Sequence, residues 1–318
     1  MTTLVTGGLG FIGLHTARSL LDQGEDVVLT QYRVAREPDF IKPYLGTRAF
    51  VEQLDVSDYD RLMEIGEKHK IDRIAHLAVP GLGALSAEDD FRINMFGLFN
   101  MLRAGDKWEC KRVGLASSGA VYGGARSTDG TNKEDMPLPV NTAGGGATGT
   151  WKKAFELIGS YWQGRTGLDV TMLRIAGIYG PLYHSMSNLP SRLVHAAVKG
   201  EAPQLRGDTY AEDGGDSTYV KDCGDGIALL MLADKLNYNC YNIGAGRATT
   251  AGELVSAIQS VIPNFKGDFL KEGHSPNSRG NSYGDLSRIK ADVSYEPKWP
   301  AEKSIPDYIN WIKAGNAE

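Results

Sequence analysis

The chain has 318 residues, 42% hydrophobic and 23% charged, and its net charge of −5 provides no basic surface for nucleic acid or an anionic membrane. Its three cysteines, Cys110, Cys223 and Cys240, are widely spaced, which argues against a zinc site and agrees with reduced thiols. The N-terminus lacks a secretion signal, and the longest strongly apolar run, 227–233, is too short to span a bilayer, so we expect a soluble cytoplasmic protein.

Strand-like and helical stretches alternate through the first half of the sequence. Such alternation implies right-handed crossovers, so we expect the α/β fold class, with a Rossmann-type doubly wound parallel sheet. The expected strands are 2–5, 25–32, 49–55, 71–78, 112–118 and 168–177, and the expected helices are 11–23, 58–69, 88–104 and 148–163.

The character of the sequence changes from Tyr179 onward, where proline and glycine are more frequent and the loops are longer. We therefore expect residues 1–178 to form a dinucleotide-binding domain, to which part of 217–250 returns. Residues 179–318 should form a smaller, mainly substrate-binding portion. The helices expected in this portion are 189–199, 222–235 and 250–262.

A glycine-rich turn, "LVTGGLGFIG", separates the first strand from the first helix. Gly7 permits the tight turn, Gly10 lets backbone N–H groups approach a pyrophosphate, and Gly13 lets the helix pack closely on the strand. Phe11 and Ile12 begin the helix whose N-terminus faces that group. The position of the turn between a strand and a helix predicts a dinucleotide site.

The second strand normally ends in an acidic residue that holds the adenosine ribose, but here Gln31 stands in that place. Arg33 and Arg36 follow, and an arginine can bind a 2′-phosphate with two hydrogen bonds, so we favour NADP over NAD. The alternative is that both arginines are solvated loop charges. Asp55 and Val56 fall where the loop after the third strand can reach the adenine, although Asp55 could equally cap the next helix.

Taken together, the motifs resemble those of the extended short-chain dehydrogenase/reductases, the NAD(P)-dependent epimerase/dehydratase family. The resemblance runs through "TGGLGFIG", "IAHLAVP", "INMFGLFNML", "ASSGAVYG", "LRIAGIYGP", "YNIGAG" and "WPAEKSIPDYINWI". It implies cofactor contacts from Leu77, Ala78 and Ile178, a supporting role for Asn94 and a catalytic serine at Ser118.

The family's catalytic helix carries the pattern YGxxKxxxE, and this chain departs from it. Aligning Gly149, Lys152 and Glu156 on the pattern puts Thr148 where the acid/base tyrosine would stand. A nearby ammonium can lower the pKa of a phenol, but an aliphatic alcohol has no accessible anion. Thr148 and Lys152, four residues apart, should share one helix face, while Lys153 should face solvent.

Another group must move the proton if the protein is an active enzyme. His184 and Tyr183, in "YGPLYHSMSN", lie on a loop that should border the substrate. The alternative for both is a surface loop or a packing contact. A water held by Thr148 and Ser118 is another route, and His76 is interpreted as a packed strand residue.

Three features bear on the substrate. Gly177 replaces the asparagine of the family's "LRxxNxYGP", Gly215 replaces an arginine that often grips a diphosphate, and the segment after Pro181 is short. These features favour a small substrate, whereas Arg279, near a second phosphate-binding position, keeps a nucleotide sugar possible. The residues expected to line the substrate site are Gly119, Ala120, Gly177, Asn188 and Arg279.

Our leading hypothesis is an NAD(P)-dependent oxidoreductase or epimerase acting on a small sugar acid, hydroxy-carbonyl compound or aromatic alcohol. The alternatives are a nucleotide-sugar epimerase or dehydratase, a lyase-type reaction with retained cofactor, a catalytically silent dinucleotide-binding protein, and an ordinary enzyme in which Thr148 is an engineered replacement of tyrosine. The acidic residues within 208–216 are read as a solvated loop and not as a metal site. The resemblance also implies a homodimer, formed through helices near 90–104 and 148–163.

Overall fold

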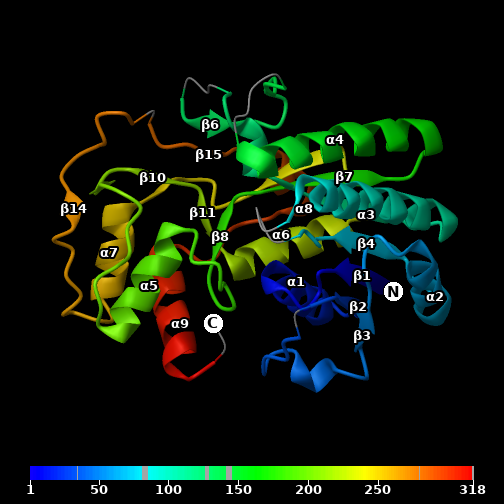
Figure 1. Ribbon diagram of the computed structural model, residues 1–318, viewed down its shortest axis with the longest axis horizontal. Coiled ribbons are helices and arrows are strands. Elements are labelled where there is room, and N and C mark those ends of the chain that lie inside the picture. The colour runs from blue at the N-terminus through cyan, green and yellow to red at the C-terminus, as the bar shows by residue number, and fades with distance from the viewer. Residues whose placement is uncertain (34, 81–84, 126–128, 141–144, 279, 317–318) are drawn as a thin grey trace.

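A seven-stranded parallel sheet forms the centre of the computed structural model, which describes residues 1–33, 35–80, 85–125, 129–140, 145–278 and 280–316 (Figure 1). The chain adds strands on one side of β1 and then on the other, which leaves a crevice at the carboxyl ends of β1 and β4. The predicted Rossmann-type sheet is thereby confirmed. Its strands, in order across the sheet, are β12 (Cys240–Ile243), β7 (Val170–Ile175), β5 (Arg112–Ser118), β4 (Arg73–His76), β1 (Thr2–Thr6), β2 (Asp26–Gln31) and β3 (Ala49–Gln53).

Helices cover both faces of this sheet because successive strand residues point to opposite sides. In β1, Val5 belongs to a buried cluster that contains Leu20 and Ile227, whereas Leu4 belongs to a cluster that contains Leu102 and Phe155. The first cluster lies under α1 (Phe11–Asp22), α6 (Val220–Leu232) and α8 (Ser287–Val293); the second lies under α2 (Tyr59–His69), α3 (Ala87–Lys107) and α4 (Gly146–Thr166).

A third buried cluster lies beside the sheet, under α5 (Leu189–Lys199), α7 (Ala251–Gln259) and α9 (Ala301–Lys313) (Figure 1). β8 (Gly177–Tyr179) follows β7 directly and pairs in parallel with β11 (Ser217–Tyr219), so the two parts of the chain are joined by backbone hydrogen bonds. The remaining pairs are β6 (Thr131–Asn132) with β15 (Tyr283–Gly284), β9 (Thr209–Tyr210) with β14 (Leu270–Lys271), and β10 (Gly214–Gly215) with β13 (Thr249–Thr250); the short helices are η1 (Lys42–Tyr44) and η2 (Gly119–Tyr122).

Most predicted elements agree with the structure, and 112–118 and 189–199 agree residue for residue. The helices α8 and α9 and the strand β12 were not among the predicted elements. Where the chain divides into domains, at residue 178 or elsewhere, stays a prediction.

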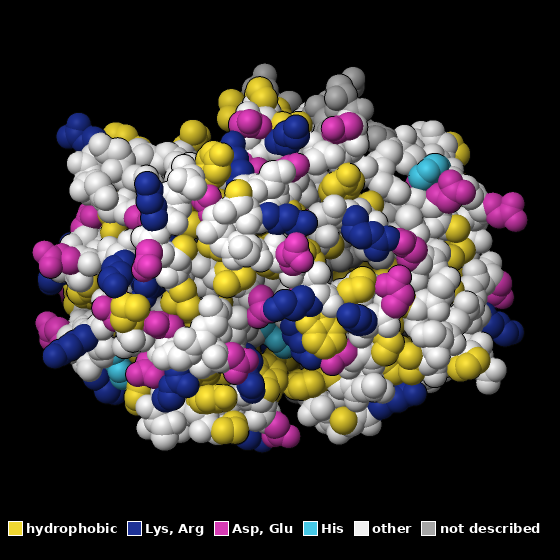
Figure 2. Space-filling model, turned by 180° about the vertical axis from the view of Figure 1, so that it is seen from behind, with side chains coloured by type: hydrophobic (Ala, Val, Ile, Leu, Met, Phe, Trp, Pro, Cys, Tyr) yellow, Lys and Arg dark blue, Asp and Glu magenta, His cyan; other side chains and the backbone are white. Residues whose placement is uncertain are grey.

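Charged side chains of both signs are interspersed over the face seen in Figure 2. Among the described residues, no helix combines the length and the apolar character that crossing a membrane requires.

Candidate functional site

The turn between β1 and α1 leaves no room for side chains at its glycines. Gly7 has a φ of 64°, which residues with a Cβ rarely adopt. A Cβ at Gly10 would lie 2.9 Å from the Gly7 carbonyl oxygen, and one at Gly13 would lie closer still. α1 begins after Gly10 with no side-chain cap and no acidic residue in its first turn. The first N–H groups of the helix, including those of Phe11 and Ile12, are therefore available to an anion such as a pyrophosphate.

The ends of β2 and β4 border this turn. The Gly7 N–H donates to Thr30 Oγ1 at 3.0 Å. The N–H groups of Leu77 and Ala78 both donate to Thr6 Oγ1, at 3.1 Å each. A Cβ at Gly7 would lie 3.1 Å from the Ala78 Cα. Leu77 and Ala78, predicted to contact the cofactor, thus lie beside the turn with their N–H groups already bonded.

The loop after β3 has its own hydrogen bonds. Asp55 Oδ1 accepts from the N–H and the hydroxyl of Ser57, at 2.9 and 2.7 Å. α2 is capped by Asp58, so the alternative that Asp55 caps this helix is wrong. The Val56 carbonyl accepts from Asn100 Nδ2 at 3.0 Å, which fixes the loop on α3. Contact of Asp55 and Val56 with the adenine stays a prediction.

Gln31 is the last residue of β2, and no carboxylate stands in its place. The guanidinium carbon of Arg33 lies over the ring of Tyr32, 5.2 Å from its centroid. Both Tyr32 and Arg33 are exposed. Arg33 is therefore held by a ring contact at the surface and remains able to turn toward a phosphate.

Arg36 faces the loop after β8. Its Nη1 donates to the Leu182 carbonyl at 3.2 Å, and its Nη2 lies 3.0 Å from His184 Nδ1. The ring of Tyr183, between these two partners in sequence, packs edge-on against Phe11, with centroids 5.0 Å apart. The guanidinium is thus engaged away from the end of β2, which weakens the prediction that Arg36 binds a 2′-phosphate.

The beginning of α4 lies against the end of β5. Ser118 ends β5, and its Oγ accepts from the Ala120 N–H at 3.1 Å. Gly145 caps α4 with a φ of 85°, and a Cβ there would collide with the Ala120 carbonyl oxygen. Thr148 is half-buried and Lys152, one turn later, is buried. Gly145 therefore lets the helix begin close to the segment that follows Ser118.

Lys152 is a buried ammonium without an acceptor. Among the described residues its Nζ has no hydrogen-bond partner, and it lies 4.6 Å from the Phe155 ring centroid. Burial lowers the pKa of Lys152 to about 8. Burial and the charge of Lys152 lower the pKa of His76 to about 3, so His76 is neutral. It lies 2.8 Å from Thr6 Oγ1 and stacks on Phe155, as expected of a packed strand residue.

Lys153 is also buried, so the expectation that it faces solvent is wrong. Its Nζ donates to the Pro139 carbonyl at 2.6 Å. The Pro139 carbonyl takes the place of water as the acceptor of this ammonium. The two adjacent lysines thus differ in one respect, since Lys153 has an acceptor and Lys152 has none.

Asn94, predicted to support the active site, lies buried on α3. Its Nδ2 donates to the carbonyl and to Oδ1 of Asp90, at 2.8 and 3.0 Å. Asp90 Oδ2 in turn accepts from Trp151 Nε1 at 2.7 Å, next to Lys152 in sequence. Asn94 is thus linked through Asp90 to α4, and its supporting role stays a prediction.

A buried ion pair anchors the same helix to the sheet. Arg174 in β7 donates from Nε and Nη2 to the two carboxylate oxygens of Glu156, at 2.9 and 2.7 Å. Ser117 also donates to Glu156. Arg174 Nη1 donates to the Tyr122 hydroxyl at 2.9 Å, which donates to Asn242 Oδ1 at 2.8 Å. In the sequence, Glu156 marks only the alignment with the family pattern, although an arginine inside an apolar strand signals a buried acid.

A cavity of about 230 Å³ is lined by residues of this network and by glycines. Gly119 and Gly177, both predicted substrate residues, are brought together in its wall. Gly215, where the family has an arginine, lies there too. The remaining lining residues include Tyr122, Asn132, Arg174, Asp216, Asn242 and Tyr283.

Both the oxygen and the nitrogen of the Asn188 side-chain amide make hydrogen bonds. Its Oδ1 accepts from the Ser191 N–H at 2.9 Å and so caps α5, and its Nδ2 donates to the Ile178 carbonyl at 2.8 Å. Contacts of Asn188 with substrate and of Ile178 with cofactor stay predictions. Arg279 lies outside the described residues.

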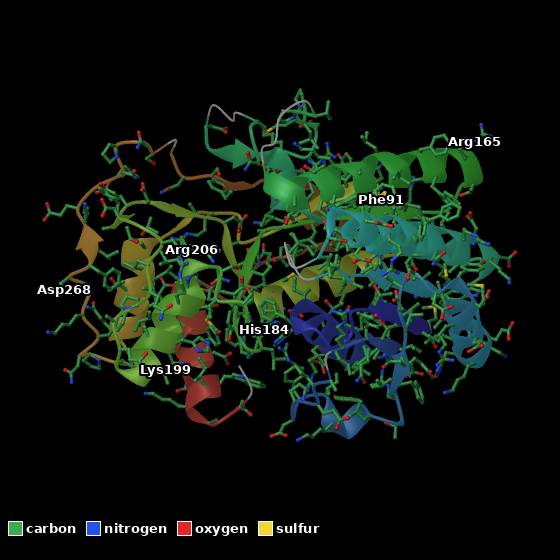
Figure 3. The ribbon with its side chains drawn as sticks, in the orientation of Figure 1. Phe91, Arg165, His184, Lys199, Arg206 and Asp268 are labelled. Carbon is green, nitrogen blue, oxygen red and sulfur yellow. The ribbon has the colours of Figure 1, made fainter. Side chains whose placement is uncertain are left out.

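Tyr183 and His184 lie at the glycine turn rather than beside Ser118. The Tyr183 hydroxyl is bonded to Ser187, and its ring lies against Phe11. His184 is exposed between the two halves of the molecule (Figure 3). Within the described part of the chain, neither residue hydrogen-bonds to Ser118 or to α4. Their predicted replacement of the tyrosine therefore gains no support from the geometry.

The acidic residues after position 207 are partly structural. Asp213 bonds to His274 at 2.9 Å near the surface. Asp216 accepts from the N–H groups of Ala245 and Gly284, at 2.8 and 3.0 Å, and burial raises its pKa. The interpretation as a solvated loop is wrong for Asp216. In the described ranges, no group of three or more His, Cys, Asp or Glu side chains is placed to hold a metal ion.

Known proteins share this sequence pattern and this arrangement. The family model described as the NAD-dependent epimerase/dehydratase family matches residues 3–244. UDP-glucose 4-epimerase of Lacticaseibacillus casei is 28% identical over 279 residues, which cover 82% of this chain and 81% of that one.

Two solved structures are similar over nearly the full length. UDP-glucose 4-epimerase of Thermotoga maritima, solved with UDP-glucose, has a TM-score of 0.82 and 24% identity, with 99% of each chain covered. UDP-glucose 4-epimerase of Thermus thermophilus, solved with NAD, has a TM-score of 0.77 and 24% identity, with 98% of this chain and 99% of that chain covered. With a family model that matches three quarters of its length, the chain belongs to the NAD-dependent epimerase/dehydratase family, of the extended short-chain dehydrogenase/reductase type.

Proposed function

We propose that this protein oxidises one carbinol of a nucleotide sugar and reduces it again, as an NAD(P)-dependent epimerase. The observation that carries the proposal is the buried Lys152 Nζ without an acceptor. A buried ammonium is costly unless it is bonded, and the ribose hydroxyls of a dinucleotide would supply the missing acceptors. The glycine turn, which a Cβ would fill, fits a pyrophosphate in the same way.

The proton follows a route that needs no tyrosine. A bound nicotinamide supplies hydride acceptance and return. Ser118 Oγ holds the substrate oxygen by a hydrogen bond, and Thr148 passes the hydroxyl proton toward Lys152. Because the pKa of Lys152 is about 8, its neutral form is populated near neutral pH and can take that proton. On the return step, the ammonium gives the proton back through the same hydroxyl.

Variants at position 148 test this route, with conversion of UDP-glucose to its epimer followed by chromatography. Thr148→Ser should keep the activity, and Thr148→Val should lose about tenfold or more, since only the valine lacks a hydroxyl. The wild-type rate should rise with pH through about 8, following Lys152. Equal rates for the serine and valine variants would refute the relay. Absence of conversion with every nucleotide sugar, in spite of NADH binding, would favour a catalytically silent protein.

Two arginines support an anionic substrate. Nε and Nη1 of Arg192, in the first turn of α5, are buried and make no hydrogen bond to any residue that the structure describes. Burial and the charge of Arg206 lower the pKa of Arg192. Figure 3 shows Arg206 beside the beginning of α5, with Lys199 at the other end. Two guanidinium groups in proximity favour a diphosphate, and they would replace the arginine that is absent at Gly215.

The length of the chain agrees with this substrate class. The match to the Thermotoga enzyme covers 99% of both chains, so the short segment after Pro181 does not separate this chain from an enzyme solved with UDP-glucose. A small sugar acid remains the competing substrate, because Gly119, Gly177 and Gly215 leave a cavity of only about 230 Å³.

Arg192→Ala and Arg206→Ala decide between the two substrates. Each should raise the KM for UDP-glucose about tenfold or more, as expected for the loss of charged hydrogen bonds. Arg165→Ala, at the far end of α4, is the matched control and should leave KM unchanged (Figure 3). Turnover of free sugar acids, with no dependence on Arg192, would overturn the nucleotide-sugar assignment.

We propose NADP as the preferred cofactor on the basis of Arg33 and the missing acid at Gln31, whereas the family description and the similar structures name NAD. Arg33→Ala should then weaken NADPH binding about tenfold and leave NADH binding unchanged, as measured by nucleotide fluorescence. Equal affinities of the wild-type protein for NADH and NADPH would remove the proposal.

We further propose a homodimer through α3 and α4. Phe91, Phe96 and Phe99 on α3 and Leu157 and Tyr161 on α4 are large apolar side chains that remain exposed. The two helices pack against each other, so these side chains form one apolar surface that a second copy can cover. Phe96→Glu should convert a dimer into a monomer in light scattering. A monomeric wild-type protein would refute the assignment.

A further inference from the structure

Two loops from different parts of the chain meet over the beginning of α1. One follows β2 and carries Arg36; the other follows β8 and carries Leu182 and His184. Arg36 Nη1 donates to the Leu182 carbonyl at 3.2 Å, and Nη2 lies 3.0 Å from His184 Nδ1. We call these two contacts the Arg36 bridge. Beneath it, the ring of Tyr183 packs against Phe11, the first residue of α1.

The Arg36 bridge crosses the path of a dinucleotide. In a doubly wound sheet, the adenosine lies beyond the end of β2, and the pyrophosphate lies at the N-terminus of the first helix. One end of the bridge is five residues beyond Gln31, the end of β2, and the other is adjacent to the residue packed on Phe11. A dinucleotide held along this line therefore has the bridge across it.

The backbone of the second loop also depends on neighbouring contacts. Leu182 has a φ of 75°, in the left-handed region that leucine rarely adopts, and it is buried. Such a conformation persists only where surrounding contacts hold it. The hydrogen bond from Arg36 to its carbonyl is one of these contacts. Another is made by His15 of α1, whose Nε2 lies 3.4 Å from the Pro181 carbonyl.

We propose that the Arg36 bridge closes the dinucleotide groove and sets how long the cofactor stays bound. The inference rests on the proposed function, because an epimerase returns the hydride to the same nicotinamide and gains from retaining it. The planar guanidinium can contact both groups, since it reaches the Leu182 carbonyl and a ring nitrogen of His184 at once. A lysine offers a single point charge and cannot span both acceptors in the same geometry. Arg36 is thus a positioning residue for the cofactor and not a ligand of a 2′-phosphate.

Stopped-flow release of NADH, chased with excess NAD, tests the proposal without reference to turnover. Arg36→Ala should release NADH about tenfold faster, as expected for a lost charged hydrogen bond. Arg36→Lys should also release it faster. Lys42→Ala is the matched control, because Lys42 lies in the same connection between β2 and β3 and removes the same charge, but its Nζ pairs with the exposed Asp39 at 2.8 Å. Its NADH release should stay at the wild-type rate.

A double-mutant cycle tests whether Arg36 acts through His184. His184→Ala should speed NADH release less than Arg36→Ala, and combining the two should add little to the effect of Arg36→Ala alone. Melting temperatures of the unliganded variants show that each one folds. Arg36→Lys keeps the charge and the stem, so it reports the bridge even if the alanine variant folds poorly.

The results separate the possible failures. Release of NADH from Arg36→Ala and Lys42→Ala at the same rate would overturn the bridge and leave the proposed function standing. A loss of NADPH affinity in Arg36→Ala with unchanged NADH release would also overturn it, since Arg36 would then bind the 2′-phosphate. A wild-type protein that binds neither NADH nor NADPH would overturn the proposed function together with the bridge.

Discussion

Replacing Lys152 with methionine should make the protein without cofactor more stable while destroying its affinity for a dinucleotide. Methionine keeps the length of the side chain and removes a buried charge that has no hydrogen-bond partner. The pKa of Lys152 falls from 10.5 to about 8 because the ammonium is buried. At about 1.4 kcal/mol for each pH unit, keeping the ammonium charged at pH 7 costs the folded state on the order of 3 kcal/mol. The nearby Phe155 ring offsets about 1 kcal/mol of this, so Lys152→Met should gain about 2 kcal/mol.

The difference between the folded and unfolded pKa of Lys152 determines how the stability advantage of Lys152→Met changes with pH. The folded protein releases the Lys152 proton at about pH 8, whereas the unfolded chain keeps it up to about 10.5. Below pH 8 both states carry the charge, and the whole cost falls on the folded state. As pH rises from 8 to 10.5 the unfolded state binds more protons, so the wild-type protein gains stability relative to the variant. The advantage of Lys152→Met should therefore be complete below pH 8 and disappear above 10.5.

Urea denaturation at pH 7 and at higher pH measures both effects, with Lys153→Met as the control. Lys153 is equally buried, but its Nζ donates to the Pro139 carbonyl, so its replacement should lower the free energy of unfolding. Added NADH should stabilise the wild-type protein and leave Lys152→Met unchanged. A Lys152→Met variant that is less stable than the wild type at pH 7 would refute the reasoning.

Three further substitutions test the frame around the site. Gly13→Ala puts a Cβ against the Gly7 carbonyl, so it should lower the free energy of unfolding by about 3 kcal/mol and abolish NADH binding. Normal NADH binding in calorimetry would contradict the close packing. Glu156→Ala leaves Arg174 buried without its carboxylate and should lower the free energy of unfolding, measured by urea denaturation, by about 3–5 kcal/mol. A smaller loss would show that water replaces the carboxylate. Asp58→Ala removes the side-chain cap of α2 and should lower the free energy of unfolding by about 1 kcal/mol, which thermal melting would detect. An unchanged melting temperature would show that the cap is dispensable.

The sequence predicts best the features that local chemistry determines. The strand 112–118 and the helix 189–199 agree residue for residue with β5 and α5, because alternating or helical apolar patterns and a capping asparagine mark them. The glycine turn is equally local, since its three glycines lie within the seven residues 7–13, between β1 and α1. These features include the strand and the turn on which much of the candidate site is built.

Contacts between distant segments could not be predicted in the same way. Arg36 meets His184 across 148 residues, and the sequence around Arg36 contains no sign of that partner. Lys153 lies buried because the segment ending near Pro139 passes over it, which helix periodicity alone does not reveal. The seven-residue helix α8 has no side-chain cap, and β12 has four residues, so neither carries a strong local signal.

The network around Glu156 also bears on the order in which the protein is assembled. Arg174 reaches Tyr122 over 52 residues of chain, and Tyr122 reaches Asn242 over 120. Contacts between residues so far apart in the sequence form late, because the loss of chain entropy on closing a long loop precedes the energy gained from the contact. During synthesis, β12 leaves the ribosome after α4 and β7 are complete, so the helix that carries Thr148 and Lys152 has to wait for it. α4 is then anchored on its whole network only after β12 has been translated, although 14 of its 21 residues (146–159) come from the first half of the chain.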